Sequence, residues 1–173
     1  PSCNRVYQVP GGLPTVDSLC RPTHAIIDER SNPPRLIVAD TDNNRVVLYN
    51  DPAKDSIADA VIGQPGYITS TPGVGTERLR SPQGVALDPG GILWISDTGN
   101  HRVLIWHEMP TRHGQPADVV IGQPDFHSNQ PNAQQVGADP DARTLFWPYG
   151  VFSDGQRLWI ADTGNRRVLY FDT

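Results

Sequence analysis

The hydrophobic positions of this chain fall in short runs that are separated by turn-forming residues. The runs are rich in Val, Ile, Leu and Trp, and Gly, Pro, Asn and Asp stand between them. This composition favours strands that are joined by turns. No long stretch places apolar residues about every 3.6 positions, as an amphipathic helix would. The pattern therefore predicts an all-β fold.

One pair of runs occurs three times with similar polar residues between its members. Residues 37–49, 94–106 and 159–171 read IVADTDNNRVVLY, WISDTGNHRVLIW and WIADTGNRRVLYF. In each copy an apolar run ends in Asp-Thr, a short turn with Asn follows, and Arg begins the second run. Self-similarity at this spacing indicates a repeat architecture.

The repeat extends on both sides of this hairpin. Upstream, residues 22–28, 82–88 and 148–154 each begin with Pro and end with Asp. Downstream, residues 59–66 and 118–125 share the sequence Ile-Gly-Gln-Pro. A complete unit thus holds four apolar runs, which predict four strands, here named a, b, c and d in chain order.

The polar residues of the b–c hairpin have a structural explanation. Each copy carries one Asp and one Arg: Asp40, Asp97, Asp162 and Arg45, Arg102, Arg167. We expect the carboxylates to accept backbone N–H groups of the turn, and the Arg side chains to pair with them within one unit or across to the next. Gly99 and Gly164 are expected to adopt positive φ there. Because an active site is normally needed once, this set indicates framework and not catalysis.

Residues 82–88 read Pro-Gln-Gly-Val-Ala-Leu-Asp, and residues 93–104 read Leu-Trp-Ile-Ser-Asp-Thr-Gly-Asn-His-Arg-Val-Leu. These two segments resemble the NHL repeat, and the similarity extends over nearly the whole chain. The first copy departs from it, with His24 in place of Gly and Asp42-Asn43 in place of Gly-Asn. The resemblance implies a β-propeller of four-stranded blades, as in WD40 proteins, with six blades in a ring. It implies no single function, because NHL-like propellers include RNA binders, interaction modules, sensor domains and a few lyases or hydrolases.

The number of strands constrains the assembly. The runs predict a strand d at residues 4–10, blades at 22–66 and 82–125, and three strands of a last blade at 148–173. The N-terminal strand is therefore the one that the last blade lacks. Propellers usually have about 4–8 blades, and three open blades would leave the last strand c as an unpaired edge.

Three arrangements fit this count. We favour a homodimer in which strand d of one subunit completes the last blade of the other, which gives a six-bladed ring with twofold symmetry. A self-closed three-bladed monomer would need strongly splayed blades. In the third arrangement the chain is a fragment of a longer propeller.

Composition narrows the class of partner. The formal net charge is −5, which argues against nucleic acid, because phosphate binding needs a basic face. No apolar run is long enough to span a bilayer, and no segment has the pattern of a signal peptide. Cys3 and Cys20 flank the first strand, and we expect a disulfide between them in a secreted or periplasmic protein. Two reduced thiols would instead indicate the cytoplasm.

The candidate site is formed by positions at which the repeats differ. By resemblance to other propellers, strand a lines the central channel, and the d–a and b–c connections share one face. The d–a connections at 66–81 and 125–147 are long, and long loops on a rigid scaffold often carry function. The residues predicted to bind a ligand on this loop face are Thr23, His24, Asn44, Gln83, His101, Trp147, Tyr149 and Arg166.

Two of these residues are large aromatics at the entry to the last blade. Trp147 and Tyr149 are either a platform for a ligand or packing that holds the loop on the blade. The sequence leaves both interpretations open.

Metal catalysis is the competing hypothesis. Some lyases with NHL-like propellers hold zinc through His residues of different blades. The His residues of this chain are His24, His101, His107, His113 and His127. Only the first begins a strand a, and no HxxxH, CxxC or G-x-S-x-G spacing occurs. We therefore predict a non-catalytic module without a cofactor that binds a protein or a small molecule. The alternative is a propeller lyase or hydrolase with a metal in the channel.

Overall fold

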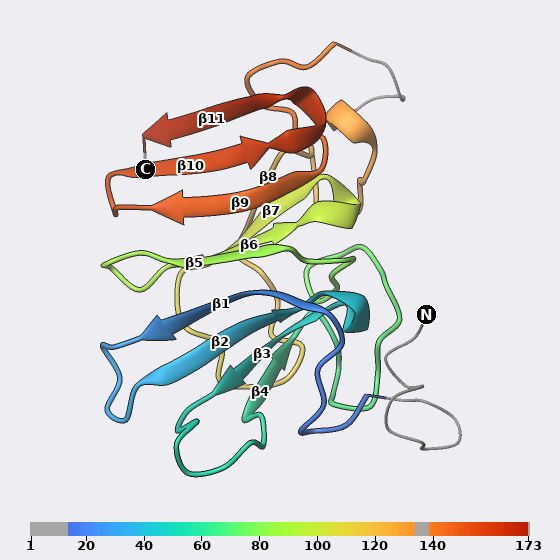
Figure 1. Ribbon diagram of the computed structural model, residues 1–173. Helices are drawn as coiled ribbons and strands as arrows, with labels where there is room; N and C mark the ends of the chain where they lie inside the picture. Colours follow the sequence, from blue (N-terminus) through green and yellow to red (C-terminus); the bar gives the residue numbers. More distant parts are fainter. Residues whose placement is uncertain (1–13, 134–138, 173) are drawn as a thin grey trace.

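The computed structural model describes residues 14–133 and 139–172. Its strands form three antiparallel sheets, ordered β1-β2-β3-β4, β5-β6-β7-β8 and β11-β10-β9 (Figure 1). The strands are β1 (Pro22–Asp28), β2 (Arg35–Asp40), β3 (Arg45–Tyr49), β4 (Ala60–Ile62), β5 (Gly84–Leu87), β6 (Leu93–Asp97), β7 (Arg102–Trp106), β8 (Val119–Ile121), β9 (Pro148–Ser153), β10 (Arg157–Asp162) and β11 (Arg167–Asp172). Besides these strands, the only helical elements in the described residues are short 3₁₀ turns. The prediction of an all-β fold is confirmed, and the predicted strand at 4–10 lies outside the described residues.

The b–c hairpins close through 3₁₀ turns and not through left-handed glycines. The turns are η2 (Thr41–Asn43), η3 (Thr98–Asn100) and η5 (Thr163–Asn165), and a further 3₁₀ segment is η4 (Pro131–Ala133). The residue after each hairpin turn has φ between 52° and 56°: Asn44, His101 and Arg166. The expectation that Gly99 and Gly164 would carry the positive φ is therefore wrong. Both glycines lie one position earlier in the turn than Asn100 and Asn165, and the chain leaves the turn only after these Asn residues.

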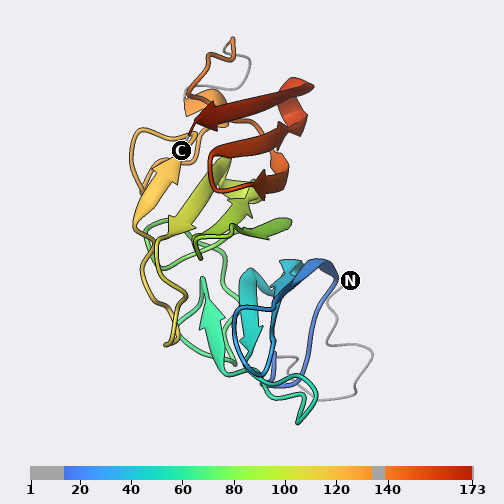
Figure 2. The same ribbon diagram turned by 90° about the vertical axis from the view of Figure 1, so that its left-hand side faces the viewer.

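The three sheets stack face to face, with β1, β5 and β9 as adjacent inner strands (Figures 1 and 2). Apolar side chains from both neighbours fill the space between the first two sheets, and Trp106 is the largest fully buried side chain there. A second cluster, which includes Trp94 and Leu158, fills the space between the second and third sheets. This stacking of strand meanders about a line of inner strands is what propeller blades show.

Hydroxyl groups of the repeated Asp-Thr sequence connect one sheet to the next. Thr41 Oγ1 donates to the carbonyl oxygen of Pro82 at 2.7 Å, and Thr98 Oγ1 donates to that of Pro148. In the third copy, Thr163 is exposed, and the only hydrogen bond of its hydroxyl within residues 14–133 and 139–172 goes to the carbonyl of Ala161 in its own sheet.

The outer face of the third sheet is apolar and exposed. Phe152, Val168 and Tyr170 have 59%, 66% and 65% of their surface exposed. The aligned positions of the second sheet are Ala86, Val103 and Ile105, and all of them are buried against the third sheet. We define Phe152, Val168 and Tyr170 as the open face.

No helix in the described part of the chain has the length and apolar character that a bilayer crossing requires.

Candidate functional site

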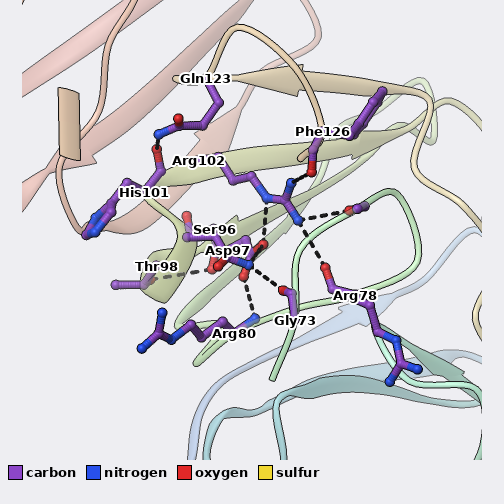
Figure 3. Close-up of polar contacts among 12 residues, drawn as sticks. Gly73, Arg78, Arg80, Ser96, Asp97, Thr98, His101, Arg102, Gln123 and Phe126 are labelled. Carbon is purple, nitrogen blue, oxygen red and sulfur yellow. Dashed lines mark hydrogen bonds and ion pairs between the residues drawn. The ribbon is translucent and has the colours of Figure 1, made fainter. Parts of the chain in front are cut away.

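The repeated carboxylates organise the end of the stack where the b–c hairpins lie. Asp97 Oδ1 accepts the backbone N–H of Arg80 at 2.6 Å, and its Oδ2 accepts hydrogen bonds from Asn100 Nδ2 at 2.8 Å and Arg102 Nε at 2.7 Å (Figure 3). The other copies repeat this network around Asp40 and Asp162.

The predicted role of these carboxylates in capping their own turn is wrong, because no side chain caps the 3₁₀ turns. Strand b pairs with strand a, so that Asp40 lies opposite Pro22 and Asp162 lies opposite Pro148. This pairing brings the segment that leads into strand a within reach of the carboxylate. The carboxylate binds the N–H two positions before that proline.

The Arg side chain then ties two loops to the same hairpin. Arg102 Nη2 donates to the carbonyls of Gly75 and Arg78 in the preceding loop, at 2.9 and 3.1 Å. Its Nη1 donates to the carbonyl of Phe126 in the following loop at 2.5 Å. Each Arg is paired with the carboxylate of its own unit and not with that of the neighbouring unit.

The variable hairpin position also holds the neighbouring blade. Asn44 Oδ1 accepts the backbone N–H of Ser81 at 2.8 Å, and His101 Nδ1 accepts that of Trp147 at 3.2 Å. Both side chains thus present a hydrogen-bond acceptor at the δ1 position. The third member, Arg166, has no acceptor in its side chain, and it is exposed.

A cavity of about 480 Å³ opens where the d–a and b–c connections meet. We call it the mouth pocket. Its lining residues are Arg21, Arg80, Ser81, Gln83, Thr98, Gly99, His101, Trp147 and Tyr149. The predicted residues Gln83, His101, Trp147 and Tyr149 therefore come together around one cavity.

The other predicted residues lie outside the lining. Thr23 Oγ1 donates to the carbonyl of Gln83 at 2.9 Å. His24 Nδ1 accepts the N–H of Val85 at 3.1 Å, so it joins β1 to β5. Asn44 is buried in the contact with Ser81 described above.

Two aromatic rings keep much of their surface accessible at the pocket. Trp147 is 50% exposed and Tyr149 is 41% exposed. The ring of Trp147 lies 4.8 Å from that of Phe146 and 6.3 Å from that of His101, measured between centroids. Packing of the loop onto the blade is performed by Phe146, whose ring and carbonyl lie against Gly164.

His101 is uncharged in this environment. Its burial, and then the nearby charge of Arg80, lower the pKa of His101 to about 4, although Asp162 acts in the opposite direction. Because Nδ1 accepts the N–H of Trp147, the proton of the neutral ring is on Nε2.

Sequence reasoning missed the two cations of the pocket. Arg80 occupies the position whose N–H binds the repeated Asp, and Arg21 directly precedes the first residue of β1. The only available signal was that both lie just before the proline that opens strand a. The residues predicted from the sequence, such as Gln83 and Tyr149, follow this proline instead.

A second cavity, of about 650 Å³, lies at the opposite ends of the inner strands. It has apolar walls, including Ile27 and Phe152, and several carboxylates on its rim. Three of these carboxylates have partners: Asp28 pairs with Arg30, and Asp88 and Asp154 accept backbone N–H groups of the a–b turns.

Within the ranges 14–133 and 139–172, no three His, Cys, Asp or Glu side chains are grouped so that they could hold a metal ion. Cys20 is 4% exposed. Cys3 lies outside the described residues, so the disulfide between them stays a prediction.

Comparison with known proteins places these observations in a family context. Residues 79–106 match the model of the NHL repeat, and no curated protein matches the chain. A structural genomics protein of unknown function from Bacteroides thetaiotaomicron VPI-5482 is similar to it with a TM-score of 0.56 and 15% identity, over 95% of this chain and 37% of that one.

An auxiliary nutrient binding protein from the same organism is similar with a TM-score of 0.47 and 12% identity, over 79% of this chain and 35% of that one. The chain thus spans little more than a third of the length of these solved structures. At 15% identity, the similarity to the structural genomics protein indicates a shared fold only. The family match confirms the resemblance found in the sequence: residues 79–106, which match the NHL repeat, contain the whole β6–β7 hairpin.

Proposed function

We propose that this protein is a non-catalytic binding module that takes a small ligand in the mouth pocket. The observation that carries the proposal is the convergence of non-repeated side chains on one cavity, namely Gln83, His101, Trp147 and Tyr149. The cavity volume of about 480 Å³ lies in the range of about 300–1,000 Å³ that is usual for small-molecule sites.

The hydrogen bonding of the polar side chains that line the mouth pocket supports a binding function. Thr98 Oγ1 is engaged by the carbonyl of Pro148. In contrast, the side-chain amide of Gln83 and the hydroxyl of Tyr149 make no hydrogen bond to any residue that the structure describes. A ligand can supply the partners that these groups lack. His101 is a poor general base, because its pKa is about 4, and this favours binding over catalysis.

A thermal-shift screen of metabolites tests this proposal. A ligand that raises the melting temperature of the wild type should lose most of its effect on Trp147→Ala and Tyr149→Ala. The control is Ile68→Ala, because Ile68 is 62% exposed in the loop between β4 and β5 and does not line the pocket. Undiminished binding by both aromatic variants would show that the pocket is not the site.

We also propose that two copies close a six-bladed ring, in which the N-terminal strand at 4–10 completes the third blade of the other copy. The open face supports this, because the aligned residues of the second sheet are covered by a blade. Thr163 supports it as well, since its counterparts Thr41 and Thr98 both donate to the next blade.

The third Arg gives the most specific support. Arg45 Nη1 donates to the carbonyl of Tyr67, and Arg102 Nη1 to that of Phe126. Arg167 Nη1 has no acceptor among the described residues, and 24% of its side chain is exposed. In the repeat alignment Gly12 stands where Tyr67 and Phe126 stand. A second copy that closes the ring would supply the missing acceptor.

Size-exclusion chromatography with light scattering tests the ring. The wild type should have the mass of a dimer, and Tyr170→Glu should shift it to a monomer, because a charge would be buried between blades. The matched control Ile68→Glu places the same charge on an exposed position away from the open face. A monomer mass for the wild type excludes this assembly.

A further inference from the structure

The mouth pocket has a positive charge that the surrounding residues do not neutralise. Its lining contains Arg21 and Arg80 but no carboxylate. Arg21 Nη2 pairs with Asp42 Oδ1 at 2.8 Å, in an exposed ion pair. Within the part of the chain that the structure describes, the guanidinium of Arg80 pairs with no carboxylate. One cation is therefore left for an anion from solution.

The backbone and stem of Arg80 are held in place. Its N–H donates to Asp97 Oδ1 at 2.6 Å, and its carbonyl accepts the N–H of Gly99 at 2.9 Å. Its side chain lies over Gly99, where a β-carbon would come within 2.6 Å of Arg80 Cγ. Figure 3 shows the guanidinium on the side of Thr98 and His101, away from the Asp97–Arg102 pair. The ordered stem reduces the entropy that binding an anion would cost.

Trp147 is held in a backbone conformation that a bulky residue rarely adopts. Its φ is 49°, in the left-handed region that favours glycine. Its N–H donates to His101 Nδ1. The aligned residues Arg21 and Ser81 have φ of 48° and 47°, so all three repeats share this conformation, and Ser81 shows that a small residue is compatible with it. An exposed indole in such a backbone conformation indicates a functional role for the flat face of the Trp147 ring.

We propose that the ligand of the mouth pocket is a carboxylate attached to a flat or chair-shaped ring, such as an aromatic acid or a sugar acid. This rests on the function proposed above. The guanidinium of Arg80 accommodates the carboxylate through charge-assisted hydrogen bonds. The ring of the ligand lies on Trp147 and Tyr149, which supply apolar surface with polar edges. His101, as a neutral donor at Nε2, adds no second charge, so a monoanion matches the pocket.

Matched probes test this proposal by isothermal titration calorimetry at low ionic strength. Indole-3-acetate should bind about tenfold more tightly than its neutral analogue indole-3-acetamide, because a hydrogen bond to a charged group is worth more than a neutral one. Tryptamine should not bind. Glucuronate and glucose form a second pair, which distinguishes a sugar acid from an aromatic acid as the source of the carboxylate.

The variant Arg80→Gln should abolish the preference for either acid over its neutral partner, while the affinity for indole-3-acetamide stays within about twofold. Gln keeps the β- and γ-carbons over Gly99, so the loop should fold normally. Arg112→Gln is the matched control, because Arg112 is exposed in the connection between β7 and β8 and does not line the pocket. This control should keep the preference.

The outcomes separate the two proposals. Equal affinity for acid and neutral analogue, or absence of binding by both acids at millimolar concentration, overturns the ligand assignment. Binding of a neutral ligand that still depends on Trp147 would leave the binding function intact. If Trp147→Ala and Arg80→Gln both still bind the acid, the mouth pocket is not the binding site.

Discussion

Arg102 Nε lies 2.7 Å from Asp97 Oδ2 in an ion pair whose two side chains are fully buried. Complete burial raises the pKa of Asp97, and the charge of Arg102 acts against this rise. The equivalent pair of the third copy, Arg167 with Asp162, has the same distance but is partly open to solvent. The two pairs therefore differ in environment while their geometry is the same.

This difference predicts unequal costs when the Arg is removed. Arg102→Leu should lower the free energy of unfolding by about 3–5 kcal/mol, because it leaves a buried carboxylate without its partner. Arg167→Leu should cost clearly less, because 24% of the Arg167 side chain is exposed, so water can enter the space that its guanidinium leaves next to Asp162. Urea unfolding of both variants at low protein concentration checks this. Equal losses would contradict the structural distinction between the pairs.

His101 predicts a pH dependence of stability. Its pKa is about 4 in the folded protein and 6.5 when unperturbed, so the unfolded chain binds more protons between these values. Stability from this group is complete above pH 6.5 and is lost as the pH falls toward 4, by up to about 3 kcal/mol. Thermal unfolding between pH 4 and 7 measures the loss.

The repeat itself supplies the control for His101. Asn44 performs the same contact with a side chain that does not titrate. His101→Asn should therefore keep the bond to the N–H of Trp147 and show a weaker dependence of stability on pH. An unchanged pH profile would mean that other groups cause the dependence.

Gly84 lies so close to the neighbouring blade that no side chain fits at this position. A β-carbon there would lie 2.2 Å from the carbonyl oxygen of Tyr149, where β5 meets β9. Gly84→Ala should therefore cost about 1–3 kcal/mol and displace one wall of the mouth pocket. Gly66→Ala is the control, because nothing lies within 4 Å of its added carbon. Similar melting temperatures for the two variants would contradict this contact.

The two cysteines predict a measurable redox state. If Cys3 and Cys20 form a disulfide, alkylation should add mass only after reduction, and reduction should lower the melting temperature. Intact-mass spectrometry with and without reductant checks this. Two labels without reductant would exclude the disulfide and remove the main reason for expecting a secreted or periplasmic protein.

The sequence predicted the strands well because their signals are local and repeated three times. Apolar runs between Pro, Gly and Asn positions are sufficient to place β2 and β3 and their counterparts. The direction in which Asp97 points was not predictable in the same way. Its partner, the N–H of Arg80, is distant in sequence and becomes a neighbour only through the pairing of β5 with β6.

The mouth pocket was predictable only in part. Tyr149 and Gln83 stand out because they differ at an aligned position, and that comparison needs no structure. Arg80 stands two positions before the strand, and its backbone serves the framework while its side chain faces the cavity. A residue with both roles has no distinct signal in a repeat alignment.

The contacts of Arg102 with two successive loops bear on how this molecule unfolds. Repeat proteins are often described as sums of modules that can open separately at their ends. Here the guanidinium takes carbonyls from the loop before its blade and from the loop after it. If either loop opens, the buried guanidinium of Arg102 loses carbonyl partners while the rest of its blade is still folded. We therefore expect the blades to lose structure in one cooperative transition, with similar hydrogen-exchange protection from β2 to β7.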